Sequence, residues 1–191
     1  MDNLIMNIKQ LIRLSGEEEE LVDRLFTESV LQPGEYFLEQ GKICRQVGFI
    51  VQGLLRYFVT PDGVEKTFYF SREEEWVCNY RSFLPMQASD TSIQALEETR
   101  LRVISYDGLQ RFYREVAEGE RFGRLAIEQV YLTSIEQVRS LYADGPEQRY
   151  RQFLSAYPDV AQRIPPYHFA SFVGVWPLSL SRIRKRRAAG G

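Results

Sequence analysis

The sequence is poor in the residues that most metal and redox sites use. Its 191 residues include one histidine, His168, and two cysteines, Cys44 and Cys78. The cysteines form no CxxC motif, and two thiols are too few for a four-thiolate iron–sulfur cluster. A metal centre of the cupin kind needs several histidines. We therefore expect no metal and no cofactor, and two free thiols in a reducing compartment.

The sequence also lacks a long apolar run. Its first twenty residues have no hydrophobic segment typical of a signal peptide, and no later stretch approaches the length of a membrane span. No nucleophile and base are arranged in a recognisable catalytic motif. These absences favour a cytoplasmic protein that is not an enzyme and has no membrane partner.

Charge is nearly balanced overall but unevenly distributed. The net charge is −2, yet residues 149–191 hold eight Lys and Arg against one acid, Asp159. The 16 basic and 25 acidic residues that remain give positions 1–148 a charge of −9. This asymmetry favours a basic module for a polyanion, attached to an acidic body.

The acidic body has the texture of an antiparallel β-domain. Short runs rich in β-branched and aromatic residues alternate with Gly, Pro and Asp turn signals between about Val30 and Tyr106. Residues 4–28 before it have helical spacing, and Ser15 ahead of a glutamate run is typical of a helix N-cap. The pattern predicts an α+β protein whose β-roll, a jelly roll, has flanking helices.

Helical spacing returns after Asp107 and continues to about Tyr142, where Asp144-Gly145-Pro146 should break the helix. Two apolar stripes run along this segment, and a helix that is apolar on two sides needs two partners. We expect one face to lie on the β-domain and the other on the same helix of a second subunit; a monomer that covers both faces is the alternative. The stripes comprise Leu125, Leu132, Ile135, Val138 and Tyr142, and Ile127, Val130, Tyr131, Val138 and Leu141.

The last part of the chain fits a helix-turn-helix from Pro166 to Lys185. Ala170 takes the position where the two helices cross closely, and Gly174 takes the turn that requires a positive φ. The five positions expected to be buried are Phe169, Val173, Val175, Leu180 and Ile183. A helical hairpin with a solvated basic end is the alternative.

The second helix of such a motif lies in the major groove of DNA, where serine and arginine can bind phosphates or base edges. Arg182 can grip guanine or phosphate in a fork. We therefore predict a DNA-binding face made of Trp176, Pro177, Leu178, Ser179, Ser181, Arg182, Lys185 and Arg186.

The order of these parts resembles the Crp/Fnr superfamily of bacterial transcription regulators. The similarity spans residues 20–187 and includes Gln32-Pro33-Gly34-Glu35, Gln40-Gly41, the run from Val47 to Arg56, and the segment from Phe169 to Lys185. The resemblance implies a sensor domain over residues 1–116, a dimerisation helix over 117–143 and a DNA-binding domain over 144–191. It also implies a homodimer on a near-palindromic double-stranded DNA operator, with RNA polymerase as a further candidate partner.

The chain departs from the family members that bind cyclic nucleotides. Cys78-Asn79 stands where their phosphate cassette has Gly-Glu, and Ser89-Asp90-Thr91 stands where it has Arg-Ser-Ala. Without the arginine a buried phosphate loses its charge-assisted partner, and Asp90 would repel it. We expect cAMP to bind weakly or not at all, so that the effector, if there is one, is another small molecule.

The roll also contains residues that could form an effector pocket. Aromatic residues of the roll are either plain core or the lining of a pocket that also has polar contacts from the cassette segment. This candidate pocket comprises Phe68, Trp76, Asn79, Tyr80, Arg81, Ser89, Thr91 and Ser92.

The chain ends soon after the second helix, without the β-wing of many family members, which is consistent with truncation. A sensor that docks on a protein partner through its C-terminal helices is the alternative function.

Overall fold

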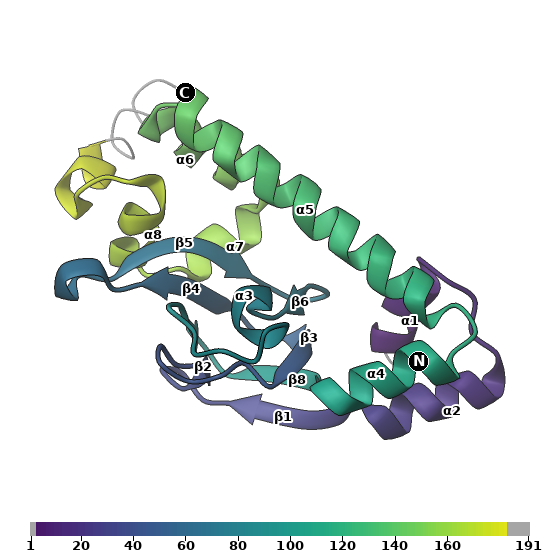
Figure 1. Cartoon of the computed structure of the whole chain (residues 1–191). Helices are drawn as coiled ribbons and strands as arrows, with labels where there is room; N and C mark the ends of the chain where they lie inside the picture. The colour runs from purple at the N-terminus through teal and green to yellow at the C-terminus, as the bar shows by residue number, and fades with distance from the viewer. Residues whose placement is uncertain (1–2, 183–191) are drawn as a thin grey trace.

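A computed structural model describes residues 3–182 of the chain (Figure 1). Two helices come first, α1 (Asn3–Lys9) and α2 (Gly16–Leu25). Ser15 begins α2 with a full capping box, in which its hydroxyl accepts from the backbone N–H of Glu18 and the Glu18 carboxylate accepts from the backbone N–H of Ser15. The predicted N-cap is therefore confirmed.

The β-roll consists of two four-stranded antiparallel sheets. The first has the order β1-β8-β3-β6 and the second the order β2-β7-β4-β5. In chain order the strands are β1 (Thr27–Leu31), β2 (Tyr36–Leu38), β3 (Gln46–Gln52), β4 (Leu55–Val59), β5 (Lys66–Ser71), β6 (Trp76–Val77), β7 (Ser92–Ala95) and β8 (Thr99–Ser105). A 3-10 turn (Pro61–Gly63) joins β4 to β5, and the short helix α3 (Tyr80–Phe83) follows β6. The predicted antiparallel jelly roll is confirmed.

Strand β4 is buried on both of its faces, which explains its unbroken apolar run. Leu55 and Tyr57 belong to the core of the roll. Arg56 lies between them, so its side chain points to the opposite face of the strand, away from that core, and it is 1% exposed. Gly53 precedes the strand with a φ of 114°, and a Cβ there would lie 2.6 Å from the Cα of Thr99, so only glycine fits.

Two helices, not one, follow the roll: α4 (Tyr106–Glu115) and α5 (Gly119–Ala143). Ser105 caps α4, and the chain turns at Val116 so that α5 folds back beside α4. A Cβ on Gly119 would lie 2.5 Å from the carbonyl oxygen of Phe112, so this close approach requires glycine. The helical spacing after Asp107 did not reveal this break, although the helix that the resemblance implies over residues 117–143 begins close to the start of α5.

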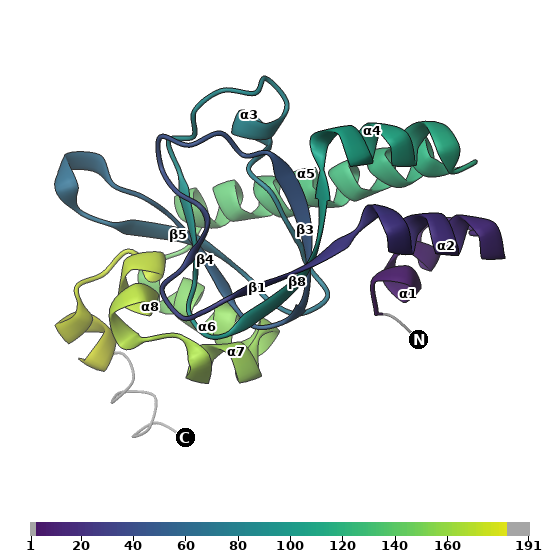
Figure 2. The same ribbon diagram turned by 90° about the horizontal axis from the view of Figure 1, so that it is seen from below.

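The C-terminal part is helical and packs beside β4 and β5, while α1, α2 and α4 lie at the opposite end of the roll (Figures 1 and 2). Its helices are α6 (Pro146–Ala156), α7 (Pro158–Arg163), α8 (Pro166–Val173) and a further helix over Pro177–Arg182. A proline begins each of them, where its fixed φ suits the first helical turn and its missing N–H costs nothing. The predicted break at Asp144-Gly145-Pro146 is confirmed, since α5 ends at Ala143 and α6 begins at Pro146.

Candidate DNA-binding surface and its docking interface

Helix α8 and the helix from Pro177 form the predicted helix-turn-helix. Phe169, Ala170, Val173 and Leu180 are each at most 1% exposed, and Val175 is half-buried. Gly174 ends α8 in the left-handed region with a φ of 76°, and its N–H donates to the last turn of the helix. These positions agree with the sequence expectation; Ile183 lies outside the described residues.

The second helix of the motif presents an uncovered face. Trp176 is 81% exposed and Leu178 is 77% exposed at its start. Pro177, Ser181 and Arg182 are also exposed, whereas Ser179 is half-buried. The face therefore combines apolar, hydroxyl and guanidinium groups that a partner can reach. Lys185 and Arg186, which complete the predicted set, lie outside the described residues.

Three arginines of the basic segment have intramolecular partners. Arg149 donates to the backbone oxygens of Asp144 at 2.7 Å and of Val173 at 2.6 Å, so it satisfies carbonyls at the ends of α5 and α8 together. Arg151 pairs with Glu147 at 2.6 Å, and Arg163 pairs with carboxylates of the roll. Arg149 and Arg163 are thus engaged within the molecule, so fewer basic groups of residues 149–182 are left for a polyanion than the sequence suggested.

Helix α8 is docked on the outer face of the roll through a buried arginine. Arg56 of β4 contacts Nδ1 of His168 at 2.5 Å, Glu65 at 2.8 Å and Gln94 at 2.8 Å, and its guanidinium lies 4.0 Å above the ring of Phe58. Burial, and then the charge of Arg56, lowers the pKa of His168. His168 thus packs within the molecule.

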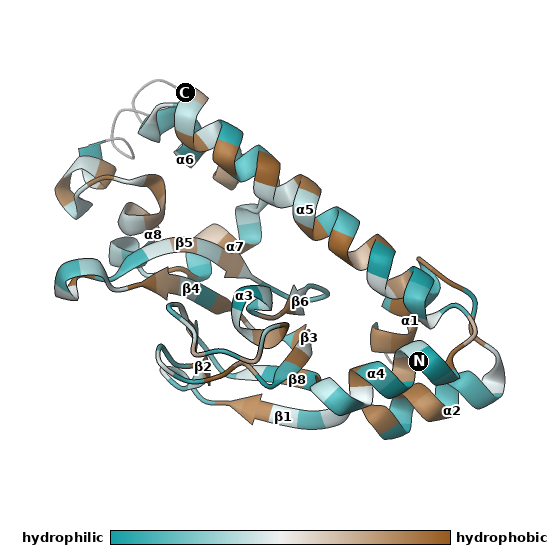
Figure 3. Ribbon diagram, in the orientation of Figure 1, coloured by the Kyte–Doolittle hydropathy of each residue, from teal (hydrophilic) through white to brown (hydrophobic). Residues whose placement is uncertain are grey.

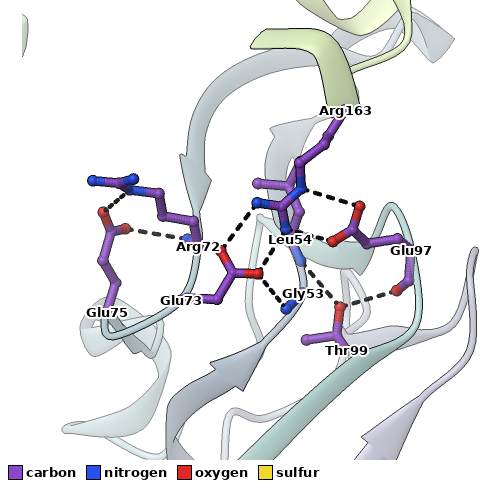
Figure 4. Close-up of polar contacts among 8 residues, drawn as sticks. All are labelled: Gly53, Leu54, Arg72, Glu73, Glu75, Glu97, Thr99 and Arg163. Carbon is purple, nitrogen blue, oxygen red and sulfur yellow. Dashed lines mark hydrogen bonds and ion pairs between the residues drawn. The ribbon is translucent and has the colours of Figure 1, made fainter. Parts of the chain in front are cut away.

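A second polar cluster fastens α7 to the roll (Figure 4). Arg163 donates to Glu73 at 2.8 and 3.0 Å and also pairs with Glu97. The hydrogen bonds to Glu97 and Glu73 raise the pKa of Arg163, and Glu73 also accepts from the backbone N–H of Gly53 at 2.8 Å. The two carboxylates come from different loops, so one arginine joins three segments that are distant in sequence.

Apolar packing accompanies these polar contacts. Leu54 and Phe70 of the roll belong to the same buried cluster as the core of the helix-turn-helix. The ring of Phe70 lies 5.4 Å from that of Phe172 and 6.0 Å from that of Phe153. The N–H of Thr67 in β5 also donates to the hydroxyl of Ser171 at 2.9 Å. The C-terminal helices and the roll therefore share a core.

Apolar residues recur along most of helix α5 (Figures 1 and 3), and many of their side chains are exposed. Phe122 near its start is buried. We had expected one face of this helix to lie on its own roll, but beyond Phe122 most residues of the two apolar stripes are exposed. Between α5, β5, α6 and α8 lies a groove of about 970 Å³. The exposed apolar residues of α5 are Ile127, Val130, Tyr131, Leu132, Ile135, Val138, Leu141 and Tyr142, each at least 41% exposed.

Five of the residues predicted for the effector pocket surround α3. Asn79 caps α3 and donates to the hydroxyl of Ser89 at 2.8 Å, and the Ser89 hydroxyl donates to the Thr91 carbonyl at 2.7 Å. Arg81 is exposed and pairs with Asp90 at 3.1 Å. Tyr80 packs edge-on against Phe83. These polar groups mostly satisfy one another.

The other three predicted pocket residues lie apart from α3. The ring of Trp76 packs against Phe49 and Phe122, and its Nε1 donates to Asn7 at 3.0 Å. Phe68 is 46% exposed and lines the groove beside α5. The hydroxyl of Ser92 accepts from the backbone N–H of Gln40 at 3.0 Å. The structure thus brings part of the predicted set together around α3 and places the rest elsewhere.

No group of three or more His, Cys, Asp and Glu within residues 3–182 is placed to hold a metal ion. None of the helices in that range is both long enough and apolar enough to cross a membrane.

A β-roll followed by a long helix and a helix-turn-helix is the architecture of Crp/Fnr-type regulators, and known structures share it with this chain. The structure of FixK2 from Bradyrhizobium japonicum matches with a TM-score of 0.73 at 15% identity, over 87% of this chain and 86% of that one. A transcriptional regulator assigned to the Crp/Fnr family from Eubacterium rectale matches with a TM-score of 0.71 at 15% identity, over 93% and 85%. The c-di-GMP-responsive global regulator CLP of Xanthomonas campestris matches with a TM-score of 0.72 at 14% identity, over 93% of both chains.

The sequence model of the cyclic nucleotide-binding domain matches residues 28–128, more than half of the chain. The protein belongs to this family. The matched range runs from β1 into α5 and so contains the whole roll. No curated protein sequence matches the chain, and the identities to the solved structures are low enough that those structures show the fold alone.

Proposed function

We propose that the protein is a DNA-binding transcription regulator that acts as a homodimer. The observation that carries the proposal is the helix-turn-helix with an uncovered second helix, attached to a cyclic nucleotide-binding-type roll. The similar structures that are described as transcriptional regulators support it. In this function the second helix enters the major groove, where Ser181 and Arg182 contact phosphates or base edges.

Dimerisation through α5 would present two such helices to one operator. The apolar side chains on α5 are a surface that water solvates poorly, and the same helix of a second copy offers an equal surface related by two-fold symmetry. Two recognition helices related in this way fit half-sites about one helical turn apart. A near-palindromic operator follows from this geometry.

Removing the guanidinium of Arg182 tests the DNA contact. We expect Arg182→Ala to relax sequence preference at one operator position, at a cost of roughly 1–3 kcal/mol for the preferred base pair. Arg186→Ala or Arg187→Ala should weaken binding to all sequences alike and reduce its salt dependence. Fluorescence anisotropy with operators selected from a random palindromic library measures both effects. Wild-type binding with no sequence preference and no salt dependence would contradict the proposal.

A charge in the apolar stripe tests the dimer. We expect Leu132→Glu to shift the protein from dimer to monomer, because a carboxylate at the centre of an apolar helix pair is desolvated without a partner. Gln129→Glu is the matched control, since it adds the same charge at an exposed polar position of α5. Sedimentation velocity measures the oligomeric state. A wild-type monomer, or equal effects of the two changes, would overturn the assignment.

We further propose that the regulator answers to an effector other than cAMP. Arg81, a residue of α3, is exposed and already paired with Asp90, so a cyclic phosphate bound by it would have to displace a carboxylate. We expect no heat of binding in calorimetry with cAMP at concentrations up to about 1 mM. The binding free energy of cAMP would then be weaker than about −4 kcal/mol. Asp90→Ala is the informative variant: if repulsion is the barrier, this change should strengthen any residual binding. Tight wild-type binding would refute this part.

One observation favours a second function. Trp176 and Leu178 are large apolar side chains with little cover, a pattern that also suits a protein partner docking on the C-terminal helices. DNA binding that is unaffected by substitution of these two residues, together with loss of a captured protein, would favour that alternative.

A further inference from the structure

The roll brings its two cysteines side by side. Cys44 lies in the loop between β2 and β3, and Cys78 lies between β6 and α3. Their Sγ atoms are 4.0 Å apart, although 34 residues separate them in the sequence. Cys44 is 2% exposed and Cys78 is half-buried, and both thiols are free. The pair is therefore close enough for a small side-chain movement to join the sulfurs, since a disulfide needs about 2.05 Å between them.

The two thiols have different acidities. The hydrogen bond from Cys78 is the largest influence on Cys44 and, against the effect of burial, lowers the pKa of Cys44 to about 7. A backbone hydrogen bond from Asn79 contributes in the same direction. Burial raises the pKa of Cys78, and its bond to Cys44 raises it further. Both shifts favour the thiolate at Cys44 near neutral pH, with the proton held on Cys78 beside it.

We propose that Cys44 and Cys78 are an oxidation site that small hydroperoxides convert into an intramolecular disulfide. The thiolate sulfur of Cys44 attacks the peroxide, the O–O bond breaks, and Cys44 becomes a sulfenic acid. The other oxygen leaves as alkoxide or hydroxide and takes a proton from solvent to become an alcohol or water. The Cys78 sulfur then attacks the Cys44 sulfur, an S–S bond forms and the S–O bond breaks. The Cys78 proton leaves with the departing hydroxide as water. Two thiols are oxidised by two electrons, and the peroxide is reduced by the same two.

The neighbours of the pair indicate what the disulfide would move. The backbone N–H of Cys44 donates to the hydroxyl of Ser82 in α3 at 2.9 Å, and Cys78 directly precedes Asn79, the N-cap of α3. Any backbone movement that accompanies closure of the sulfurs would therefore be passed to α3 and to the loop before β3. The polar cluster of Asn79 and Ser89 moves with that helix. This site is independent of whether the chain binds DNA.

The test uses the whole protein and hydrogen peroxide. Wild-type protein is treated at neutral pH, quenched, denatured and alkylated, and its mass is measured. We expect both thiols to be lost with a mass decrease of about 2 Da, a peptide that links Cys44 to Cys78, a monomeric band on a denaturing gel without reductant, and recovery of both thiols with dithiothreitol. The proposal is overturned if wild-type protein keeps both thiols while glutathione in the same tube is oxidised. Gain of oxygen atoms without a cross-link, or a cross-link between chains, overturns it equally.

Single-cysteine variants test the two roles. In Cys78→Ser the sulfenic acid cannot be resolved, so dimedone should label Cys44. In Cys44→Ser the influence of Cys44 is lost, but burial, the largest cause of the raised Cys78 pKa, remains, and dimedone labelling should be at least several-fold weaker. Equal labelling, or stronger labelling at Cys78, contradicts the assignment of Cys44 as the nucleophile. If either variant fails to fold by circular dichroism, the wild-type mass measurement still decides whether the disulfide forms.

Discussion

Replacing Arg56 with methionine is expected to lower the free energy of unfolding by about 2–3 kcal/mol and to loosen the C-terminal helices from the roll. The side chain of Arg56 is 2% exposed, and it holds Glu65, Gln94 and His168 together. Removing one partner of a buried cluster costs about 3–5 kcal/mol when the other groups cannot reach water. Glu65 is 39% exposed and can be rehydrated, which brings the expected loss below that range. Urea denaturation measures it.

The loosening has a separate signature. Residues 144–145 connect α5 to α6, so release of the docked helices should speed limited proteolysis near Gly145. Arg100→Met is the matched control, because Arg100 also lies on a strand of the roll and pairs with a glutamate, Glu98, but both partners are largely exposed. Its effect should stay below about 0.5 kcal/mol. Equal losses in the two variants would show that Arg56 does not fasten the helices.

Truncating Phe169 should have the largest effect on the DNA-binding part. Phe169 is completely buried, and its ring lies 4.9 Å from that of Phe153 and 5.2 Å from that of Tyr150. We expect Phe169→Ala to cost about 3–5 kcal/mol, because the lost apolar contacts are joined by the cost of a cavity. Since the second helix packs on this core through Leu180, operator affinity should fall at least tenfold.

Tyr167→Ala is the control for that variant. Tyr167 lies on the same helix, two residues away, and is 53% exposed, so its truncation should cost less than about 1 kcal/mol. Thermal unfolding followed by tryptophan fluorescence and circular dichroism gives the stability of both variants, and anisotropy gives their affinity for DNA. A stable Phe169→Ala protein with wild-type affinity would mean that this core does not position the second helix.

The parts that the sequence predicted well are those that depend on local backbone geometry. Gly174 is needed where α8 ends in the left-handed region, and Ala170 is needed where two helices cross, so spacing alone placed the helix-turn-helix. Ser15 satisfies backbone donors three residues away. The strands were recognisable from turn residues that separate short apolar runs. Such signals involve residues that are close together in the sequence, so they can be recognised without knowledge of the fold.

Other features depend on which distant segments meet, and the sequence did not show them. Arg163 was counted as charge for a polyanion, but the fold sets it between Glu73 and Glu97. Arg56 interrupts an apolar strand with no sign that its partner is His168, 112 residues away. Cys44 and Cys78 match no motif, yet their sulfurs lie 4.0 Å apart. By itself the sequence determined most of the helices, strands and turns, though not the break between α4 and α5. Only the tertiary structure decided these pairings, because contacts between distant residues follow from how whole elements pack.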